Sequence, residues 1–434
     1  MKQPIYMYVI TVQCVQHHHG KGNFKRQSCF NQQAWSQYSE EDLFKILSDA
    51  VTPLWRLPYQ QQLQLKYSVN QDILRLLTQR THYIGDSEHL DFIQFSNKND
   101  GLPCVIENTK PSPQTESTRN KCELSVGVGY HGDRKTVYEK FLRSSSLDVM
   151  LDFQDGGFWR HCTVRTNLKG DVMVVVKIHP QNLSKDELRK HKDELKNHFL
   201  HSLKNDITSL YIQESIHMRE THESCPYELL YGEPYIYEKI LNKFKFRISP
   251  DSFFQTNTLA ANVLYKTIKD LCQVTNDTTL VDICCGTGTI GIVMAESVKK
   301  VIGIELISQA VDDAKLNAKL NNVTNSEYLC GRAERIIPDL MPTLVNETDI
   351  VAVVNPGRAG LHSKVIRTLR NCEFINDLVY VSCKPQGEAM KNFTDLCCPP
   401  IKKLYGRPFT PIKAVPVDMF PHTNHCELVI LFER

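Results

Sequence analysis

The stretch Val281–Gly291 reads VDICCGTGTIG and contains the pattern Gly286-x-Gly288-x-x-Gly291. The apolar run at its start has the length and composition of a buried strand, and the residues that follow it read as a helix. Glycines suit the turn between them, because the backbone must bend tightly and approach a ligand with no side chain in the way. The stretch therefore predicts a strand–turn–helix unit whose Gly286 and Gly288 contact a cofactor.

The rest of the C-terminal half continues this alternation. Short apolar runs at 300–305, 349–355 and 378–383 are separated by helical segments, and HCELVILFER at 425–434 ends the chain. Such an order is typical of a doubly wound parallel sheet. We predict an α/β fold, with the final strand pairing in the edge region of the sheet.

Two cofactors compete for the glycine-rich turn, a nicotinamide dinucleotide and S-adenosylmethionine. Glu305 ends the next strand ~20 residues on, where an acidic group accepts hydrogen bonds from ribose hydroxyls. The strand at 349–355 ends in Asn355-Pro-Gly-Arg358, a stretch typical of methyltransferase substrate pockets that an oxidoreductase does not need. The sequence therefore favours S-adenosylmethionine and a Rossmann-like class I methyltransferase sheet over a dehydrogenase.

The segment before the sheet has a different pattern. Strand-like runs between about 121 and 240 are interrupted by one helix, which Ser184 and Glu187 begin as a capping box. We predict three parts: a disordered or transit-like leader at 1–45, a helical start with an α+β RNA-binding domain at 46–240, and the methyltransferase domain at 241–434. Basic residues in the middle part either contact phosphates or are ordinary surface charge; they are Arg119, Lys121, Arg165 and Lys169.

Composition limits the compartment and the partners. Residues 1–39 contain four Lys or Arg but no Asp or Glu, which suits an organelle transit peptide, with a disordered tail as the alternative. The sequence therefore favours the mitochondrial matrix, with the cytoplasm as the alternative. The 15 cysteines form no C-x-x-C pair, which argues against a metal site, and no apolar run approaches the ~20 residues of a membrane span.

Cys383 stands where a buried strand gives out, in VYVSCKP. In an open α/β sheet ligands bind beyond the carboxyl ends of the strands, so Cys383 and Asn355 are expected beside the cofactor. A partly ionised thiol there can act as a nucleophile, although most cysteines serve only packing. Glu427 opens an apolar strand, and burial raises a carboxylate pKa toward the range of a general base; the alternative is a satisfied edge-strand glutamate.

These residues, taken in order, resemble one family. Six motifs of this chain occur in the same order as in the RNA uracil-5-methyltransferases of the TrmA/RumA group. They are Gln255 in SFFQTN, the CCGTG turn, Glu305, NPGRAGL, VSCKP and the terminal FPHTNHCELV. The resemblance covers most of residues 50–434, and several independent motifs in register make it specific. It implies that Gln255 and Glu305 hold S-adenosylmethionine and that Asn355 lies between the cofactor and the base.

The resemblance also implies a covalent mechanism. The Cys383 thiolate adds to carbon 6 of uracil, carbon 5 then accepts the methyl group, and Glu427 removes the proton from carbon 5 so that the thiolate can leave. Arg358 supports the pocket. Family members act on the T-loop uridine of tRNA or on ribosomal RNA; the sequence does not decide between them or give an oligomeric state.

The sequence departs from the family pattern at two places. Asp-Pro-Pro-Arg becomes Asn355-Pro-Gly357-Arg358, which loses a charge and loosens a stiff turn, and Lys384 follows the thiol. Lys384 either lowers the thiol pKa or points into water. A catalytically weakened RNA-binding or folding factor is therefore the alternative function. An amino-methyltransferase fits less well, because Arg358 occupies the place of its stacking aromatic.

Overall fold

The computed structural model describes residues 39–84, 87–88, 90–125, 137–150, 157–203, 206–215 and 225–434. The chain divides into two compact units. The first unit comprises Met1–Pro53, Arg119–Tyr237 and Ser249–Asp251, and the second comprises Leu54–Thr118, Glu238–Ile248 and Ser252–Arg434. Most of the predicted leader falls outside the described residues, and the predicted domain boundaries at 45 and 240 stay a prediction.

The first unit is built on a five-stranded sheet in the order β2-β3-β4-β5-β6, with β4 and β5 parallel and the other pairs antiparallel. Helices α4 and α5 contribute to one apolar core with the sheet. The predicted capping box is confirmed, because Glu187 N–H donates to Ser184 Oγ and Ser184 N–H donates to Glu187 Oε2. The elements are α1 (Glu40–Val51), β2 (Lys121–Ser125), α4 (Val137–Ser144), β3 (Trp159–Thr166), β4 (Val172–Ile178), α5 (Lys185–Leu203), β5 (Ser209–Glu214) and β6 (Tyr227–Gly232).

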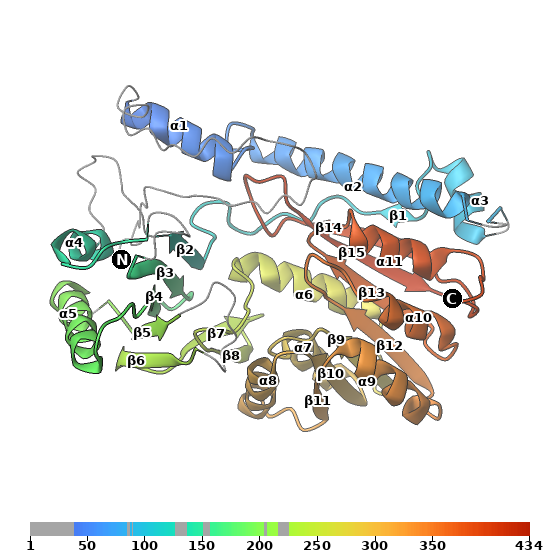
Figure 1. The fold of residues 1–434 in the computed structure, drawn as a ribbon. Helices are drawn as coiled ribbons and strands as arrows, with labels where there is room; N and C mark the ends of the chain where they lie inside the picture. Colours follow the sequence, from blue (N-terminus) through green and yellow to red (C-terminus); the bar gives the residue numbers. More distant parts are fainter. Residues whose placement is uncertain are drawn as a thin grey trace. The chain divides into compact units, whose positions relative to one another are not determined.

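The second unit contains an eight-stranded sheet in the order β1-β14-β15-β13-β12-β9-β10-β11. Its strands are β1 (Val105–Ile106), β9 (Thr278–Ile283), β10 (Lys300–Glu305), β11 (Ser326–Cys330), β12 (Asp349–Val354), β13 (Asp377–Ser382), β14 (Thr410–Val417) and β15 (Glu427–Glu433). All neighbours run parallel except β15, which is antiparallel to both β13 and β14. The predicted Rossmann-like α/β fold is confirmed (Figure 1).

Helices cover both faces of this sheet. Helices α2, α3, α9, α10 and α11 share one apolar core with it, and α6, α7 and α8 contact its other face. Their bounds are α2 (Tyr59–His82), α3 (Asp91–Lys98), α6 (Thr258–Cys272), α7 (Thr289–Met294), α8 (Ser308–Leu320), α9 (Ala333–Leu340), α10 (Ser363–Asn371) and α11 (Glu388–Cys397), with short 3-10 turns at Ala295–Ser297 and Met341–Leu344. Two-sided cover explains why the central strands read as continuous apolar runs. A separate hairpin pairs β7 (Ile236–Ile240) with β8 (Phe244–Ile248).

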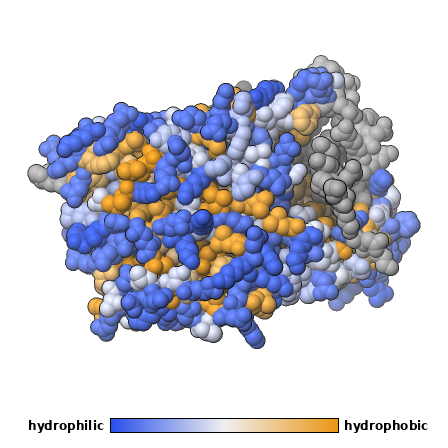
Figure 2. Space-filling model, turned by 180° about the vertical axis from the view of Figure 1, so that it is seen from behind, coloured by the Kyte–Doolittle hydropathy of each residue, from blue (hydrophilic) through white to orange (hydrophobic). Residues whose placement is uncertain are grey.

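Helix α2 comes early in the chain but packs against α11, close to its end (Figure 1). The face seen in Figure 2 carries hydrophobic residues interspersed with hydrophilic ones. Within the described ranges, no helix has the length and apolar character needed to cross a membrane. A search of the same ranges finds no group of three or more His, Cys, Asp or Glu that could hold a metal ion.

Candidate active site

Cys383 and Glu427 meet at one end of the sheet. Strand β13 ends at Ser382, strand β15 begins at Glu427, and the antiparallel register places Ser382 opposite Leu428. Cys383 directly follows Ser382, and Glu427 directly precedes Leu428, so the two residues come next to this strand pair at the same end of the sheet. The charge of Glu427 acts on the thiol of Cys383 and raises its pKa. The structure thus brings the predicted nucleophile and the predicted base together.

Arg358 acts electrostatically on both Cys383 and Glu427. Burial raises the pKa of the half-buried Cys383 thiol, Glu427 raises it further, and the Arg358 guanidinium lowers it through its charge and a hydrogen bond. Arg358 also lowers the pKa of Glu427, against the larger effect of burial. Lys384 is exposed, so of the two alternatives for this residue the structure favours the one in which it points into water.

Glu427 is a buried carboxyl group with an open acceptor position. Its side chain is 5% exposed, and burial raises its pKa to about 7. Among the residues that the structure describes, none donates a hydrogen bond to Oε2. A carboxyl group that is about half ionised near neutral pH is suited to remove a proton from a substrate.

The order of strands sets the order of the groups at their carboxyl ends. Because the strands run β13-β12-β9-β10, Cys383 after β13 is followed by Asn355 after β12, the glycine-rich turn after β9 and Glu305 at the end of β10. The half-exposed Asn355 is tied to this edge by its N–H, which donates to Ile283 O at 3.2 Å. Asn355 thus stands between the thiol and the turn, and its place between the cofactor and the base stays a prediction.

Glu305 organises the glycine-rich turn. Gly286 N–H donates to Glu305 Oε2 at 3.0 Å, while Leu306 and Ile307 N–H donate to Oε1 at 2.7 and 3.0 Å. The carboxylate therefore fixes the end of β10 to the turn after β9. Leu306 and Ile307 are each 54% exposed, which leaves apolar surface beside the carboxylate.

The two glycines of the turn differ. Both have positive φ, +55° at Gly286 and +77° at Gly288. A Cβ at Gly286 would meet no atom within 4 Å, so the backbone there faces open space. A Cβ at Gly288 would lie 3.0 Å from the Tyr328 ring, so packing is one reason for glycine at that position. Contact of either glycine with a cofactor stays a prediction.

Gln255 lies in the segment that leads into α6 and is buried, at 6% exposure. Phe253, two residues before it, is 68% exposed, whereas its neighbour Phe254 is buried. Asn257 caps α6 by accepting a hydrogen bond from Ala260 N–H. The role of Gln255 in holding a cofactor stays a prediction.

Asp282 is a buried acid next to the candidate site that we did not predict from the sequence. It is fully buried below the turn, Oδ2 accepts from Gly291 N–H at 3.1 Å, and Oδ1 has no partner in the described part of the chain. Burial raises its pKa to about 7. An acid inside the apolar run VDI is the signal that could have identified it, because buried charges are rare without a task.

The basic residues proposed for phosphate contacts have different surroundings. Arg165 is 5% exposed and donates to Ser249 O, so its interpretation as ordinary surface charge is wrong. Lys121 pairs with Glu123, and Arg119 Nε donates to Lys121 O at 2.7 Å. Contacts of these side chains with phosphates stay a prediction.

Comparison with known proteins adds three findings. A sequence model of the family described as tRNA (Uracil-5-)-methyltransferase matches residues 166–434. Proteins named "tRNA (uracil-5-)-methyltransferase homolog B" from Pongo abelii and Homo sapiens are each 45% identical over 425 residues, covering 89% of this chain and 87% and 84% of the relatives. The crystal structure of a Pyrococcus abyssi tRNA (uracil-54, C5)-methyltransferase with S-adenosyl-L-homocysteine has the same fold, with TM-score 0.60 and 24% identity over 87% of this chain and 84% of that one.

Proposed function

The chain belongs to the tRNA (uracil-5-)-methyltransferase family, and from this premise we propose that it methylates carbon 5 of a uridine in RNA through a covalent Cys383–uracil intermediate, with S-adenosylmethionine as methyl donor. The observation that carries the proposal is the position of Cys383 beside Glu427 at the carboxyl edge of the sheet, with Arg358 acting on both. Each of these side chains then has a task in one reaction.

The cofactor side of the edge fits S-adenosylmethionine. The open backbone at Gly286 admits a ligand, Glu305 offers carboxylate oxygens that are already held in place, and Leu306 and Ile307 present apolar surface for a purine ring. When bound, the cofactor supplies an electrophilic methyl group on a sulfonium. Glu305, Asn355, Gln255 and the turn are the groups proposed to hold it.

Cys383 makes carbon 5 of uracil reactive. Carbon 5 is a poor nucleophile in the intact ring, but when the thiolate forms a bond to carbon 6 the electron pair of the double bond moves onto the ring as an enolate. Carbon 5 can then take up a methyl group. Arg358 favours this step, since its charge and hydrogen bond stabilise the thiolate against burial.

Glu427 completes the reaction. Its carboxylate takes the proton from carbon 5, the carbon 5–carbon 6 double bond forms again, and the sulfur of Cys383 leaves as thiolate. The unpartnered Oε2 is available to accept this proton, and a pKa of about 7 matches the task near neutral pH. The chain therefore holds a nucleophile and a base with separate roles.

We propose that the substrate is the T-loop uridine of mitochondrial tRNA, small-subunit ribosomal RNA of mitochondria, or both. The target base has to leave its stack to reach a thiol and a buried carboxyl group, which loops permit. The matrix location rests on the acid-free composition of residues 1–39. Imaging of a tagged full-length chain tests the location; a cytoplasmic signal alone would contradict it.

Nucleoside mapping tests the function. Mass spectrometry of mitochondrial tRNA and ribosomal RNA from cells that lack the protein should show loss of 5-methyluridine. Expression of the wild-type chain should restore it, and expression of Cys383→Ala should not. Which RNA loses the nucleoside identifies the substrate. Unchanged 5-methyluridine in both RNAs would contradict the proposal.

A catalytically weakened RNA-binding or folding factor is the second candidate. Asn355 and Gly357 stand where the family pattern has an acid and a proline, and a Cβ at Gly357 would meet no atom within 4 Å. The second candidate predicts that Cys383→Ala restores RNA folding or assembly in cells that lack the protein, while 5-methyluridine is unaffected by the loss.

A further inference from the structure

The connection between β14 and β15, residues 418–426, leads directly into the proposed base. Val417 at the end of β14 pairs with Glu427 at the start of β15, so the connection leaves and re-enters the sheet at the base itself. Cys426 closes it, with Sγ 3.2 Å from Val417 O. The connection therefore meets the base at both of its ends: Cys426 is bonded to Glu427, and Asp418 follows Val417, the residue paired with Glu427 across the strands.

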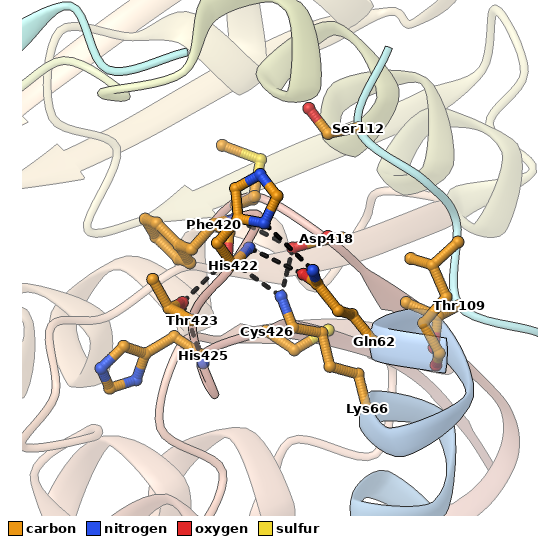
Figure 3. A network of polar contacts seen from close by, with 12 residues as sticks. Gln62, Lys66, Thr109, Ser112, Asp418, Phe420, His422, Thr423, His425 and Cys426 are labelled. Carbon is orange, nitrogen blue, oxygen red and sulfur yellow. Dashed lines mark hydrogen bonds and ion pairs between the residues drawn. The ribbon is translucent and has the colours of Figure 1, made fainter. Parts of the chain in front are cut away.

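Helix α2 holds this connection through a buried ion pair (Figure 3). Lys66 Nζ donates to Asp418 Oδ1 at 2.6 Å and to Phe420 O at 2.9 Å. The side chains of Lys66 and Asp418 are 2% and 0% exposed. Asp418 also accepts from Tyr59 OH at 2.9 Å and from Phe420 N–H at 3.1 Å. The start of the connection is thus fixed to two positions of α2.

A second pair of contacts holds the middle of the connection. His422 N–H donates to Gln62 Oε1 at 2.9 Å, and Gln62 Nε2 lies 3.0 Å from His422 Nδ1 (Figure 3). His422 has a positive φ of 65°, a backbone conformation that needs support from its surroundings in a residue other than glycine. Leu54 N–H donates to His422 O at 2.9 Å. The segment at 54–66 therefore hydrogen-bonds to the connection at two places, its start at Asp418 and its middle at His422.

The Lys66–Asp418 ion pair fixes the position of residues 418–426 on α2 more than it adds to the stability of the fold. A fully buried ion pair is often no better for stability than an apolar pair of the same volume, but a charge left alone is costly, so the pair permits one register of the two segments. Asn257 Nδ2 also donates to Met419 O at 3.3 Å, which ties the same connection to the segment that carries Gln255. The Lys66–Asp418 pair joins parts of the chain 352 residues apart in sequence.

We propose that Lys66 and Asp418 are positioning residues for the methyl transfer, and that helix α2 uses them to hold the Glu427 carboxylate at the reacting carbon beside Cys383. The inference rests on the proposed function. It assigns a role in the proton-removal step to a helix outside residues 166–434, the part that the family model matches. A base displaced by ~1 Å loses on the order of 100-fold in rate.

Single-turnover assays on an unmodified tRNA transcript test the proposal, since they separate covalent RNA–protein adduct from released 5-methyluridine. Glu427→Gln should let the methylated adduct form and persist, because the proton on carbon 5 is not removed. Lys66→Met should act in the same direction, slowing release by about 10- to 100-fold while adduct formation is kept. Lys66→Arg, which keeps the charge, should restore most of the release rate.

Matched variants separate positioning from loss of stability. Leu74→Ala trims a buried side chain of the same helix that faces the apolar core, so it should lower the active fraction without making the adduct persist. Tyr59→Phe removes one hydrogen bond to Asp418 and tests the inference if Lys66→Met fails to fold; it should show a smaller persistence of adduct.

The outcomes distinguish a failure of the positioning role from a failure of the proposed function. If the wild-type chain makes no 5-methyluridine, or Glu427→Gln releases product at the wild-type rate, the proposed function is wrong. If those two behave as expected but the folded Lys66→Met and Tyr59→Phe variants release product like wild type, or Leu74→Ala accumulates adduct equally, the positioning role is wrong.

Discussion

Glu427 acts on the thiol of Cys383: burial raises the pKa of the thiol, and the negative charge of Glu427 raises it further. Two adjacent acids each disfavour ionisation of the other, so their protons come off in coupled steps. The proposed reaction needs the two anions at different times, the thiolate for addition and the carboxylate for proton removal. Arg358, which lowers the pKa of both, makes each anion accessible in turn.

Removal of the nucleophile should abolish the reaction. We expect Cys383→Ala to lose methyl transfer and covalent adduct together, because the addition to carbon 6 needs the thiolate of this residue. Transfer of a labelled methyl group to RNA measures this directly. Cys372→Ser, another half-buried cysteine, is the matched control and should keep wild-type activity. Persistent 5-methyluridine formation by Cys383→Ala would falsify the covalent mechanism.

The pH dependence of kcat/KM should change when Arg358 is replaced. Burial raises the pKa of Glu427 to about 7 and raises that of Cys383, so the active anions are depleted at low pH and kcat/KM should rise through neutral pH. Arg358→Gln removes the cation that lowers both pKa values and should move this rise to higher pH. Lys384→Gln, at an exposed lysine, should leave the profile in place; an equal displacement in both variants would contradict the role of Arg358.

Loss of the buried base should stabilise the protein. The folded pKa of Glu427, about 7, lies above its ordinary value of 4.5, so folding binds a proton between these pH values and the ionised carboxylate opposes folding above pH 7. Glu427→Gln should therefore raise the free energy of unfolding by up to about 3 kcal/mol at pH 8. The gain should fade as the pH drops toward 4.5. Denaturant unfolding at several pH values measures this, and a gain that does not vary with pH would contradict it.

Alanine substitutions at Gly286 and Gly288 should have different effects on cofactor binding and on the stability of the fold. Gly288→Ala places a Cβ 3.0 Å from Tyr328 at a φ of +77°, so we expect a loss of stability of about 1–3 kcal/mol. Gly286→Ala meets no neighbouring atom and should cost less stability but weaken binding of S-adenosylhomocysteine. Thermal unfolding and titration calorimetry give the two quantities. The reverse pattern would show that Gly288 faces the ligand.

The parallel part of the sheet could be predicted because its strands are buried on both faces. Strands β9, β10, β12 and β13 coincide with apolar runs named from the sequence. Strand β14 was missed, since TPIKAVPV contains two prolines, which argue against a strand, and its register shifts after Pro411. Strand β15 was expected in the edge region and lies two strands in from the edge strand β1.

The reacting side chains could be predicted from the sequence, but the contacts that hold them in position could not. Cys383 and Glu427 stand at strand ends, which the pattern marks, and sheet topology then brings them together. The ion pair of Lys66 with Asp418 could not be predicted, because a charged residue on a helix reads as solvated until the helix is placed against a segment far along the chain. Long-range packing, and not local pattern, decides such contacts.

Trapping of the covalent intermediate is the strictest test of Cys383 as the nucleophile. RNA that carries 5-fluorouridine at the target offers no proton on carbon 5, so Glu427 cannot complete the elimination and the adduct should persist. We predict a complex that survives denaturation and, after digestion, a peptide in which Cys383 is bonded to a methylated nucleotide. Failure to form such a complex, or a bond to a different cysteine, would exclude Cys383 as the nucleophile.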